Sequence, residues 1–452
     1  MSEVPIATAN DTIFALATPP GRSALAVIRV SGPRALTALN GIAGATPTPR
    51  FTALRVLRHP LTKQPIDQAL VIYFKAPATE TGEDIVEFQT HGGRAIIAAM
   101  YEALVSIPGC RMAEPGEFAR RAFHNGKMDL TSIEGLADLI DAETESQRAQ
   151  ALTQASGALD KLYNGWRAEM IQAQALVEAA IDFADEGDVA NDAVMQARAS
   201  AVGLLGRIGA HLAHAHRGEI LRSGFQVVLA GPPNAGKSSL LNALARRDVA
   251  IVSEEPGTTR DVIEVRLNLA GIPVIVSDTA GIREAEGAVE REGIRRTVDR
   301  ARGADLVVWL DEVTASPGQP RLAAGGQGWT GDTVVVRSKA DLDPQRTRST
   351  GSLWLSTLTG EGVDDLIREI VDRARLKIGI DDAEPAPTQS RHHGHLDRAR
   401  QHLQAFVDGS PTELELRAED LRLAATELGR LTGRIDPEEV LGAIFGRFCI
   451  GK

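Results

Sequence analysis

The sequence predicts a multidomain protein that combines an α+β domain, an α-helical bundle and an inserted α/β domain with a doubly wound sheet. Three observations lead to this fold class. Residues 1–118 mix strand-like runs with turns, residues 119–217 contain no proline and carry long helical patterns, and residues 218–378 alternate strands with helices. Residues 379–452 are helical again. We therefore expect domains at 1–118, at 119–217 together with 379–452, and at 218–378.

In residues 1–118, strand-like runs are separated by turns, as in a mixed α+β domain. Residues 24–30 and 69–74 are apolar runs of strand length, and proline and glycine mark turns at 19–21, 31–33 and 45–49. This pattern predicts an α+β domain that contains a sheet.

Helical patterns lie on both sides of residues 218–378. Six candidate helices, three on either side, cover residues 129–141, 146–162, 166–183, 391–408, 413–432 and 437–448. Packed together they would form one bundle into which the α/β domain is inserted, and we favour this arrangement. Two separate helical modules are the alternative.

Composition excludes several classes of protein. The chain has 452 residues, 43% apolar and 24% charged, so it can bury sizeable cores and is not a disordered chain. Its two cysteines, Cys110 and Cys449, cannot form a disulfide framework, which fits a reducing compartment. Neither a signal peptide nor an apolar run of membrane-spanning length is present, so we expect a cytoplasmic protein that uses no membrane. The net charge of −11 argues against broad nonspecific binding of nucleic acid, although it allows one local basic patch.

A phosphate-binding loop stands out at residues 231–238, Gly-Pro-Pro-Asn-Ala-Gly-Lys-Ser. It follows the apolar run 225–230 and leads into the amphipathic run 239–244, the strand–loop–helix context that such a loop requires. Backbone N–H groups at the helix N-terminus approach the phosphates, Lys237 reaches the β- and γ-phosphates, and the Ser238 hydroxyl ligates Mg²⁺. The predicted contacts of this loop with a nucleoside triphosphate come from Asn234, Ala235, Gly236, Lys237, Ser238 and Ser239.

Two downstream motifs fit the phosphate end of the same site. Thr258 and Thr259 lie on a segment punctuated by glycine and proline, which can offer Thr259 to Mg²⁺ and to the γ-phosphate. The motif Asp278-Thr279-Ala280-Gly281 follows an apolar run, so Asp278 would reach the Mg²⁺ shell from a strand end. Gly281 would donate a backbone N–H to the γ-phosphate.

Two further motifs indicate that the base is guanine. Asp341, in Ser338-Lys339-Ala340-Asp341, can accept from guanine N1–H and N2–H₂, which adenine lacks. The motif Ser356-Thr357-Leu358 would donate a backbone N–H to guanine O6. Each motif alone is typical of an ordinary turn, but their order and spacing resemble those of translation-factor-class GTPases. The sequence therefore predicts GTP as the nucleotide and a Ras-like P-loop G domain.

The sequence departs from that series at two positions. Ser338 stands where the guanine motif usually has Asn, and it is too short to bond both the base and the P-loop, so we expect weaker nucleotide binding with unchanged specificity. Ile282 stands where Ras-like proteins have a water-orienting Gln, so hydrolysis needs another group. The carboxylate-rich residues 283–294 could supply it, although from composition alone they are an ordinary charged helix.

The sequence ends in Phe448-Cys449-Ile450-Gly451-Lys452, and seven other segments accompany this motif, at residues 11–13, 17–22, 81–87, 91–93, 115–118, 121–127 and 137–142. With a G domain between helical segments, they make the chain resemble the MnmE (TrmE) family of bacterial and organellar tRNA-modification GTPases. The resemblance covers essentially the whole chain.

The resemblance implies a function beyond GTP hydrolysis. Members of the family are homodimers that work with an FAD-containing partner, MnmG (GidA), in a heterotetramer or larger assembly. Together they add an aminomethyl or carboxymethylaminomethyl group to C5 of the wobble uridine (U34) of certain tRNAs. The carbon comes from a tetrahydrofolate one-carbon unit, and the N-terminal domain binds folate and mediates dimerisation.

The resemblance also assigns candidate folate contacts. They are Arg29, Glu87, Lys127 and Lys452. A cation can pair with the carboxylates of the folate glutamate tail, and Glu87 can accept from the N–H edge of the pterin. Without the resemblance each of these residues is an ordinary surface charge.

For catalysis the resemblance implies K⁺, held while two G domains dimerise across the nucleotide. The positions that match the K⁺ ligands are Asn234, Ser253, Glu255 and Thr258. Glu290 matches the carboxylate that acts on the attacking water, and Cys449 matches a cysteine implicated in tRNA modification. A lone cysteine beside an apolar helix end is also typical of a buried small hydrophobe, so both roles of Cys449 stay open.

Two other functions compete with this one. A ribosome-assembly GTPase shares the P-loop pattern, but it carries an RNA-binding domain that is often basic, whereas this chain is acidic. A folate-sensing scaffold would use GTP only as a switch. Thr259, Asp278 and Glu290 favour hydrolysis over such passive sensing.

Overall fold

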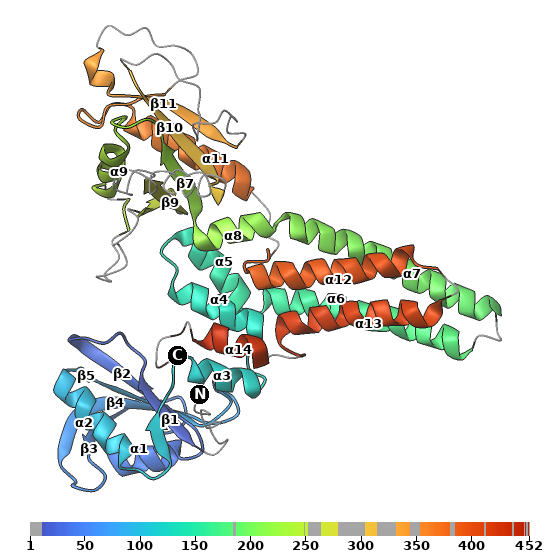
Figure 1. The fold of residues 1–452 in the computed structure, drawn as a ribbon. Coiled ribbons are helices and arrows are strands. Elements are labelled where there is room, and N and C mark those ends of the chain that lie inside the picture. The colour runs from blue at the N-terminus through green and yellow to red at the C-terminus, as the bar shows by residue number, and fades with distance from the viewer. Residues whose placement is uncertain are drawn as a thin grey trace, which may run out of the picture. The chain divides into compact units, whose positions relative to one another are not determined.

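The computed structural model describes residues 11–183, 187–247, 249–251, 264–278, 303–313, 331–343, 353–379, 385–410, 413–435, 438–446, 448 and 451. The chain separates into two compact units. Their helices and strands are labelled in Figure 1. The first unit comprises Met1–Ala137, Ala155–Arg167 and Leu428–Lys452, and the second comprises Asp138–Gln154 and Ala168–Glu427. The predicted domain bounds divide the chain more finely than these units and stay a prediction.

The first unit contains a six-stranded sheet in the order β3-β4-β5-β2-β1-β6. Its strands are β1 (Thr12–Leu16), β2 (Ser23–Ser31), β3 (Ala53–Arg58), β4 (Pro65–Phe74), β5 (Ile85–Gly92) and β6 (Cys110–Met112). Neighbouring strands are antiparallel except β1 and β6. Inward residues such as Phe88 of β5 share a core with α1 (Ala35–Ala43) and α2 (Arg94–Val105), whereas Glu87 and Gln89 on the other face are half-buried. One face of this sheet is therefore a packed core and the other is not.

The last described residues of the chain pack beside residues that follow this sheet. Leu441, Ile444 and Phe445, from α14 (Glu438–Phe445), share an apolar cluster with α3 (Glu117–His124) and the start of α4 (Leu130–Ile140). Gly116 at the start of α3 has φ 68°, and a Cβ there would lie 2.5 Å from the Phe445 carbonyl oxygen. This close approach requires glycine.

The second unit joins helices from both sides of the α/β segment. Its helices include α5 (Glu145–Ala155), α6 (Ala158–Asp182), α7 (Gly187–Ala213), α8 (Ala215–Ser223), α12 (Ser390–Asp408) and α13 (Leu414–Thr432). One small apolar pocket is lined by residues from four of these helices: Met170 of α6, Leu204 of α7, Leu403 of α12 and Leu421 of α13. Helices that precede and follow the α/β segment thus share a core, as the favoured single bundle requires.

The second unit also contains a six-stranded sheet, in the order β12-β11-β10-β7-β9-β8. Its strands are β7 (Phe225–Ala230), β8 (Glu264–Leu269), β9 (Ile272–Asp278), β10 (Leu306–Glu312), β11 (Thr333–Ser338) and β12 (Leu353–Trp354). All pairs are parallel except β8 with β9. The order and the helices between the strands are those of a doubly wound fold, so the predicted fold class is confirmed.

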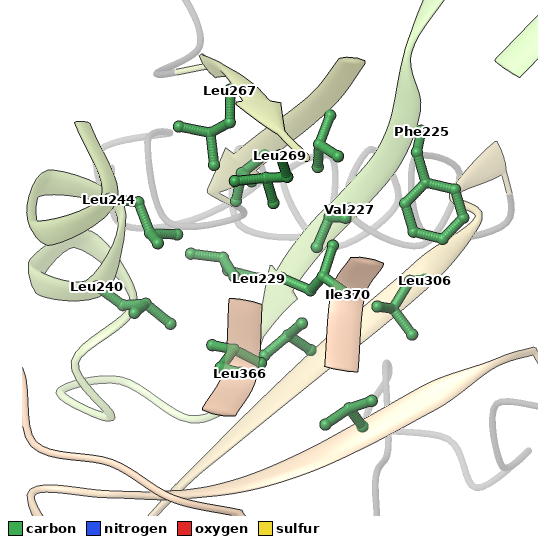
Figure 2. Packing of buried hydrophobic residues seen from close by; sticks show 14 of the residues in the cluster. Phe225, Val227, Leu229, Leu240, Leu244, Leu267, Leu269, Leu306, Leu366 and Ile370 are labelled. Carbon is green, nitrogen blue, oxygen red and sulfur yellow. The ribbon is translucent and has the colours of Figure 1, made fainter. Parts of the chain in front are cut away.

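This second sheet is buried on both faces. Leu306, Val308 and Leu310 of β10 join the cluster that contains α9 (Lys237–Ala245) and α11 (Val363–Ile378), while Val307 and Trp309 join a separate cluster on the opposite face. Figure 2 shows the first cluster closely packed around β7. Such a sheet holds the carboxyl ends of its strands in fixed positions.

Among the described residues, no helix combines the length and the apolar character that crossing a membrane requires.

Candidate functional site

The phosphate-binding loop lies between β7 and α9, as the sequence predicts. Gly231 has φ 140°, and a Cβ there would lie 2.2 Å from the carbonyl oxygen of Leu310, so the loop backbone passes directly against β10. Asn234 has φ 63°, and Gly236, with φ 91°, precedes the first residue of α9. These turns aim the N-terminus of α9 at the carboxyl edge of the sheet, where a helix favours an anion.

Lys237 lies over this loop. Its Nζ donates hydrogen bonds of 2.9 Å to the carbonyl oxygens of Gly231 and Pro232, and its side chain is buried. Burial lowers the pKa of the Lys237 ammonium, and the neighbouring Asp278 carboxylate opposes that shift. A buried cation within a ring of backbone groups is a suitable partner for phosphate oxygens.

Ser238 and Asp278 form the candidate Mg²⁺ site. The Ser238 hydroxyl donates to Asp278 Oδ2 at 2.6 Å, and Asp278 is 2% exposed. The two side chains lie close because of the strand pairing. Asp278 ends β9 and pairs with Leu229 near the end of β7, and β7 leads into the loop that precedes Ser238. A hydroxyl and a carboxylate are the hard oxygen donors that Mg²⁺ prefers, so these residues fit the ion.

The two candidate guanine motifs meet at the far edge of the sheet. The Ser356 hydroxyl donates to the Asp341 carboxylate, and the Ala340 backbone N–H donates to the Leu355 carbonyl at 3.0 Å. Lys339 adopts φ 57°, and its Nζ donates to Glu312 Oε2 at 2.9 Å. Asp341 is therefore held at the sheet edge, where the order of the motifs along the chain predicts the base.

The position that departs from the usual guanine motif has a structural partner. Ser338 is buried, and its hydroxyl donates to the Asp311 carbonyl of β10 at 3.2 Å. The Ser338 hydroxyl is thus directed to β10, and the weaker nucleotide binding expected from this departure stays a prediction.

The loop after β12 closes tightly on itself. The Ser356 N–H donates to the Glu361 carbonyl at 2.9 Å, and a Cβ on Gly362 would lie 1.8 Å from the Trp354 carbonyl oxygen. Thr357 is half-buried and Leu358 is 84% exposed at the tip of this loop. Whether Leu358 contacts a base is therefore a prediction that rests on its motif and on its exposure.

Several predicted site residues lie outside the described residues. They are Ser253, Glu255, Thr258, Thr259, Thr279, Ala280, Gly281, Glu290, Cys449 and Lys452.

A second candidate site lies on the open face of the first sheet. Arg29 of β2 and Glu87 of β5 are register partners, and Arg29 Nη2 lies 3.0 Å from Glu87 Oε1. Arg29 Nη1 also donates to Glu80 Oε2 at 2.7 Å. The structure therefore brings together two of the four predicted folate contacts, and it adds Glu80, which sequence reasoning missed.

These charged groups line a cavity of 340 Å³. Phe74 forms an apolar wall, and Arg50 stacks over its ring at 5.7 Å. Sequence reasoning also missed Arg50, whose single sequence signal is its position directly after the turn predicted at residues 45–49. The cavity pairs cationic and carboxylate groups with an aromatic surface, which suits a ligand that has both a flat ring and an acidic tail.

Lys127 does not line this cavity. It lies beside the loop that follows Glu80, where a Cβ on Gly82 would come within 3.0 Å of Lys127 Cε. Gly451, near Lys452 in sequence, lies against the end of β1, and a Cβ there would be 2.2 Å from the Leu16 carbonyl oxygen. Lys127 is thus not among the residues that line the cavity with Arg29 and Glu87.

Two protein-family models match the chain. One is described as the MnmE helical domain and matches residues 130–449, and the other is described as the GTP-binding protein TrmE N-terminus and matches residues 12–127. The first match spans the segment that contains the candidate nucleotide site.

Three relatives, each described as tRNA modification GTPase MnmE, are similar over nearly their whole lengths. The Parvibaculum lavamentivorans protein is 50% identical over 451 residues, which cover 98% of this chain and 100% of the relative. The Methylorubrum populi protein is 50% identical and covers 98% of both chains. The Brucella suis protein is 47% identical and covers 100% of both chains.

Proposed function

Because the chain belongs to the MnmE family, we infer that it is a GTPase that acts in tRNA modification. The observation that carries the GTPase activity is the candidate phosphate site. There Lys237 is buried over the loop, and the Ser238 hydroxyl and the Asp278 carboxylate lie 2.6 Å apart beside it. In that geometry Lys237 would bind the phosphates, and Ser238 and Asp278 would hold Mg²⁺, which offsets charge that develops on them.

We propose that hydrolysis depends on K⁺. Ile282 cannot orient a water molecule, so the site needs other groups to promote attack on the γ-phosphate. Asn234 lies on the loop with positive φ and offers a neutral oxygen ligand; Ser253, Glu255 and Thr258 would complete the set. Glu290 would position the attacking water.

The cation requirement and the carboxylate can be tested separately. We expect rapid hydrolysis in KCl and slow hydrolysis in NaCl, with equal rates contradicting the role of K⁺.

Glu290→Ala should lower kcat by roughly 100-fold, because a water-positioning group acts mainly in the transition state, while nucleotide affinity changes little. An equal loss of affinity and rate would reject the specific role of Glu290.

For the N-terminal domain we propose a tetrahydrofolate one-carbon derivative as ligand. Arg29 would pair with a carboxylate of the glutamate tail, and Glu87 would accept from the pterin N–H edge. Their mutual ion pair and the cavity beside them support this assignment. Lys127, which does not line the cavity, and Lys452 stay predicted contacts of the same ligand.

A homodimer is the proposed assembly. Leu54 of β3 and Leu70 of β4 are register partners on the open face of the first sheet, where they are 57% and 41% exposed. Leu25 of β2 is also exposed, at 52%. Exposed aliphatic side chains on one sheet face favour burial against a second copy of the chain.

We propose that the dimer works with the FAD-containing MnmG (GidA). The pair would add an aminomethyl or carboxymethylaminomethyl group to C5 of the wobble uridine, with Cys449 near the one-carbon unit. Gly451, two residues after Cys449, lies against β1 of the folate-binding unit, which supports a place for this terminal segment near that domain.

Mass spectrometry of tRNA nucleosides from cells with and without the gene tests this function. Loss of 5-aminomethyl-type uridines in the deletion strain, restored by the intact gene, is the expected result. A Cys449→Ser copy that fails to restore them would give Cys449 a part in the modification. An unchanged nucleoside profile would contradict the proposal and favour a GTPase of ribosome assembly.

A further inference from the structure

The turn between β8 and β9 docks on the N-terminus of α5. Both the backbone N–H and the hydroxyl of Ser146 donate to the Gly271 carbonyl oxygen, at 3.2 Å and 2.7 Å. The two residues are 125 positions apart in sequence and lie in the same compact unit. One carbonyl of the G domain therefore accepts two hydrogen bonds from a helix outside it.

The helical side of this contact is built to receive a carbonyl. Thr144 and Gln147 form a capping box: the Gln147 side chain accepts from the Thr144 N–H at 3.1 Å, and the Gln147 N–H donates to the Thr144 hydroxyl at 3.4 Å. The box leaves the N–H of Ser146 without an acceptor inside the helix. Gly271 supplies that acceptor, so the G domain completes the cap of α5.

The hairpin side of the contact is rigid. Ala270 and Gly271 have φ 53° and 85°, as in a two-residue hairpin turn of type I′. Strands β8 and β9 pair without a register shift from Leu269–Ile272 back to Glu264–Ser277. Displacement at the open end of this hairpin would therefore reach the turn instead of being absorbed between the strands.

The open end of the hairpin lies at the candidate nucleotide site. Strand β9 ends in Asp278, which accepts from Ser238. The Ile251 N–H donates to the Arg266 carbonyl at 2.9 Å, so residues 249–251 are attached to β8. The described residues on either side of the segment that contains the candidate Mg²⁺ ligand Thr259 thus both lie at β8.

A second group of contacts joins α5 to α8. Gln147 Nε2 donates to the Arg222 carbonyl of α8 at 3.0 Å, and Gln150 Nε2 donates to the Gly218 carbonyl at 3.3 Å. Helix α8 leads into β7 and hence into the phosphate-binding loop. Helix α5 therefore contacts two elements that lead to the candidate nucleotide site. One is α8, which precedes the phosphate-binding loop, and the other is the β8–β9 hairpin, which ends in Asp278.

We propose that the β8–β9 turn transmits the nucleotide state of the G domain to α5 through the two hydrogen bonds of Ser146. This proposal rests on the GTPase function proposed above. Ser146 is a positioning residue: it contacts no nucleotide group and acts through the hairpin. A change in the bound nucleotide can shift α5 only if the Ser146–Gly271 contact differs between the two nucleotide states.

Hydrogen exchange of the full-length protein tests the coupling, with GDP bound in one sample and a non-hydrolysable GTP analogue in the other. We expect exchange in the first turns of α5 to differ at least about threefold between the two samples, since local opening reports contact strength. Ser146→Ala removes the hydroxyl bond and keeps the backbone N–H bond, so it should reduce the difference at least about twofold while leaving nucleotide affinity and basal hydrolysis unchanged. Ser146→Thr, which keeps the hydroxyl, should retain it.

Thr153→Ala is the matched control, because it removes a hydroxyl from the same helix whose bond stays inside α5, to the Ala149 carbonyl. It should behave as the wild-type protein. Equal exchange in both wild-type samples, or a difference that Ser146→Ala leaves at its full size, would overturn the proposal. Failure of the GTPase function would instead appear as absent binding of both nucleotides in the same samples.

Discussion

The two sheets have the same number of described strands but differ in what covers them. The sheet of the first unit is mostly antiparallel, packs α1 and α2 on one face and leaves Leu54 and Leu70 exposed on the other. The sheet of the second unit is mostly parallel and has apolar clusters on both faces. The candidate sites follow this difference: one lies on an open sheet face, the other at the strand ends.

The difference explains why one site was easier to predict. In the second unit the phosphate-binding residues are consecutive, so local spacing in the sequence describes the site itself. In the first unit Arg29 and Glu87 are 58 positions apart and meet only through strand register. A site at strand ends can be predicted from short sequence motifs. A site on a sheet face depends on which strands pair and in which register, and short motifs do not give that information. If the two sites are separate, substitutions at one should leave ligand binding at the other intact.

The largest effect is expected from Lys237→Ala. Removing the ammonium should lower the rate of GTP hydrolysis by at least about 100-fold, because it binds the phosphates where charge develops. Single-turnover hydrolysis and nucleotide titration measure the effect. Lys161→Ala, at an exposed lysine of α6, is the matched control and should change neither quantity. Folate binding should persist in Lys237→Ala, and its loss would show that the two sites are not separate.

Glu87→Gln should produce the converse pattern. The substitution keeps the shape of the side chain but removes the charge that, in the proposed function, would accept from the pterin edge, so affinity for 5-formyl-tetrahydrofolate should fall roughly 10-fold or more. Calorimetry measures this affinity, and GTP hydrolysis should be unchanged. Unaltered folate affinity in the variant would reject the assignment of Glu87.

Leu70→Asp tests the exposed sheet face. A carboxylate at the centre of an apolar interface lacks a partner, so the dimer should weaken by roughly 10-fold or more. Analytical ultracentrifugation across a dilution series reports the change. Leu61→Asp is the control, because Leu61 is 72% exposed but lies beyond the end of β3, in the turn to β4. Equal dissociation constants for wild-type protein and Leu70→Asp would exclude this face as the interface.

The smallest effect is expected from Ser338→Asn. The longer amide can bond both the base and the loop, so affinity for GDP should rise by about 3- to 10-fold, equivalent to one ordinary hydrogen bond. Fluorescent-nucleotide titration measures it. Ser338→Ala separates the gain of the amide from the loss of the hydroxyl bond to Asp311. An unchanged affinity in Ser338→Asn would mean that the departure at this position has no cost.

Sequence patterns predicted much of the fold. The apolar runs 24–30 and 69–74 became parts of β2 and β4, and the run before the phosphate-binding loop became β7. The fold class and the family resemblance are confirmed. Local patterns succeed here because strand and helix periodicity arises from which face each residue buries.

Other features were beyond local patterns. Glu80 and Arg50 beside the candidate folate cavity carry no motif of their own, since a charge in a turn is typical of any surface. The division of α4 and α6 between the two compact units has no sequence signal either. The two halves of a long helix can pack in different cores. The local sequence does not show which core each half contacts.

The sequence by itself determined the chemistry of the candidate nucleotide site, because a phosphate-binding loop and its partner motifs are short, and their roles follow from residue type and order. Only the tertiary structure decided which distant residues meet. Strand register paired Arg29 with Glu87, and the docking of a hairpin turn joined Ser146 to Gly271. Such contacts depend on packing between segments far apart in the chain, which no local run of residues encodes.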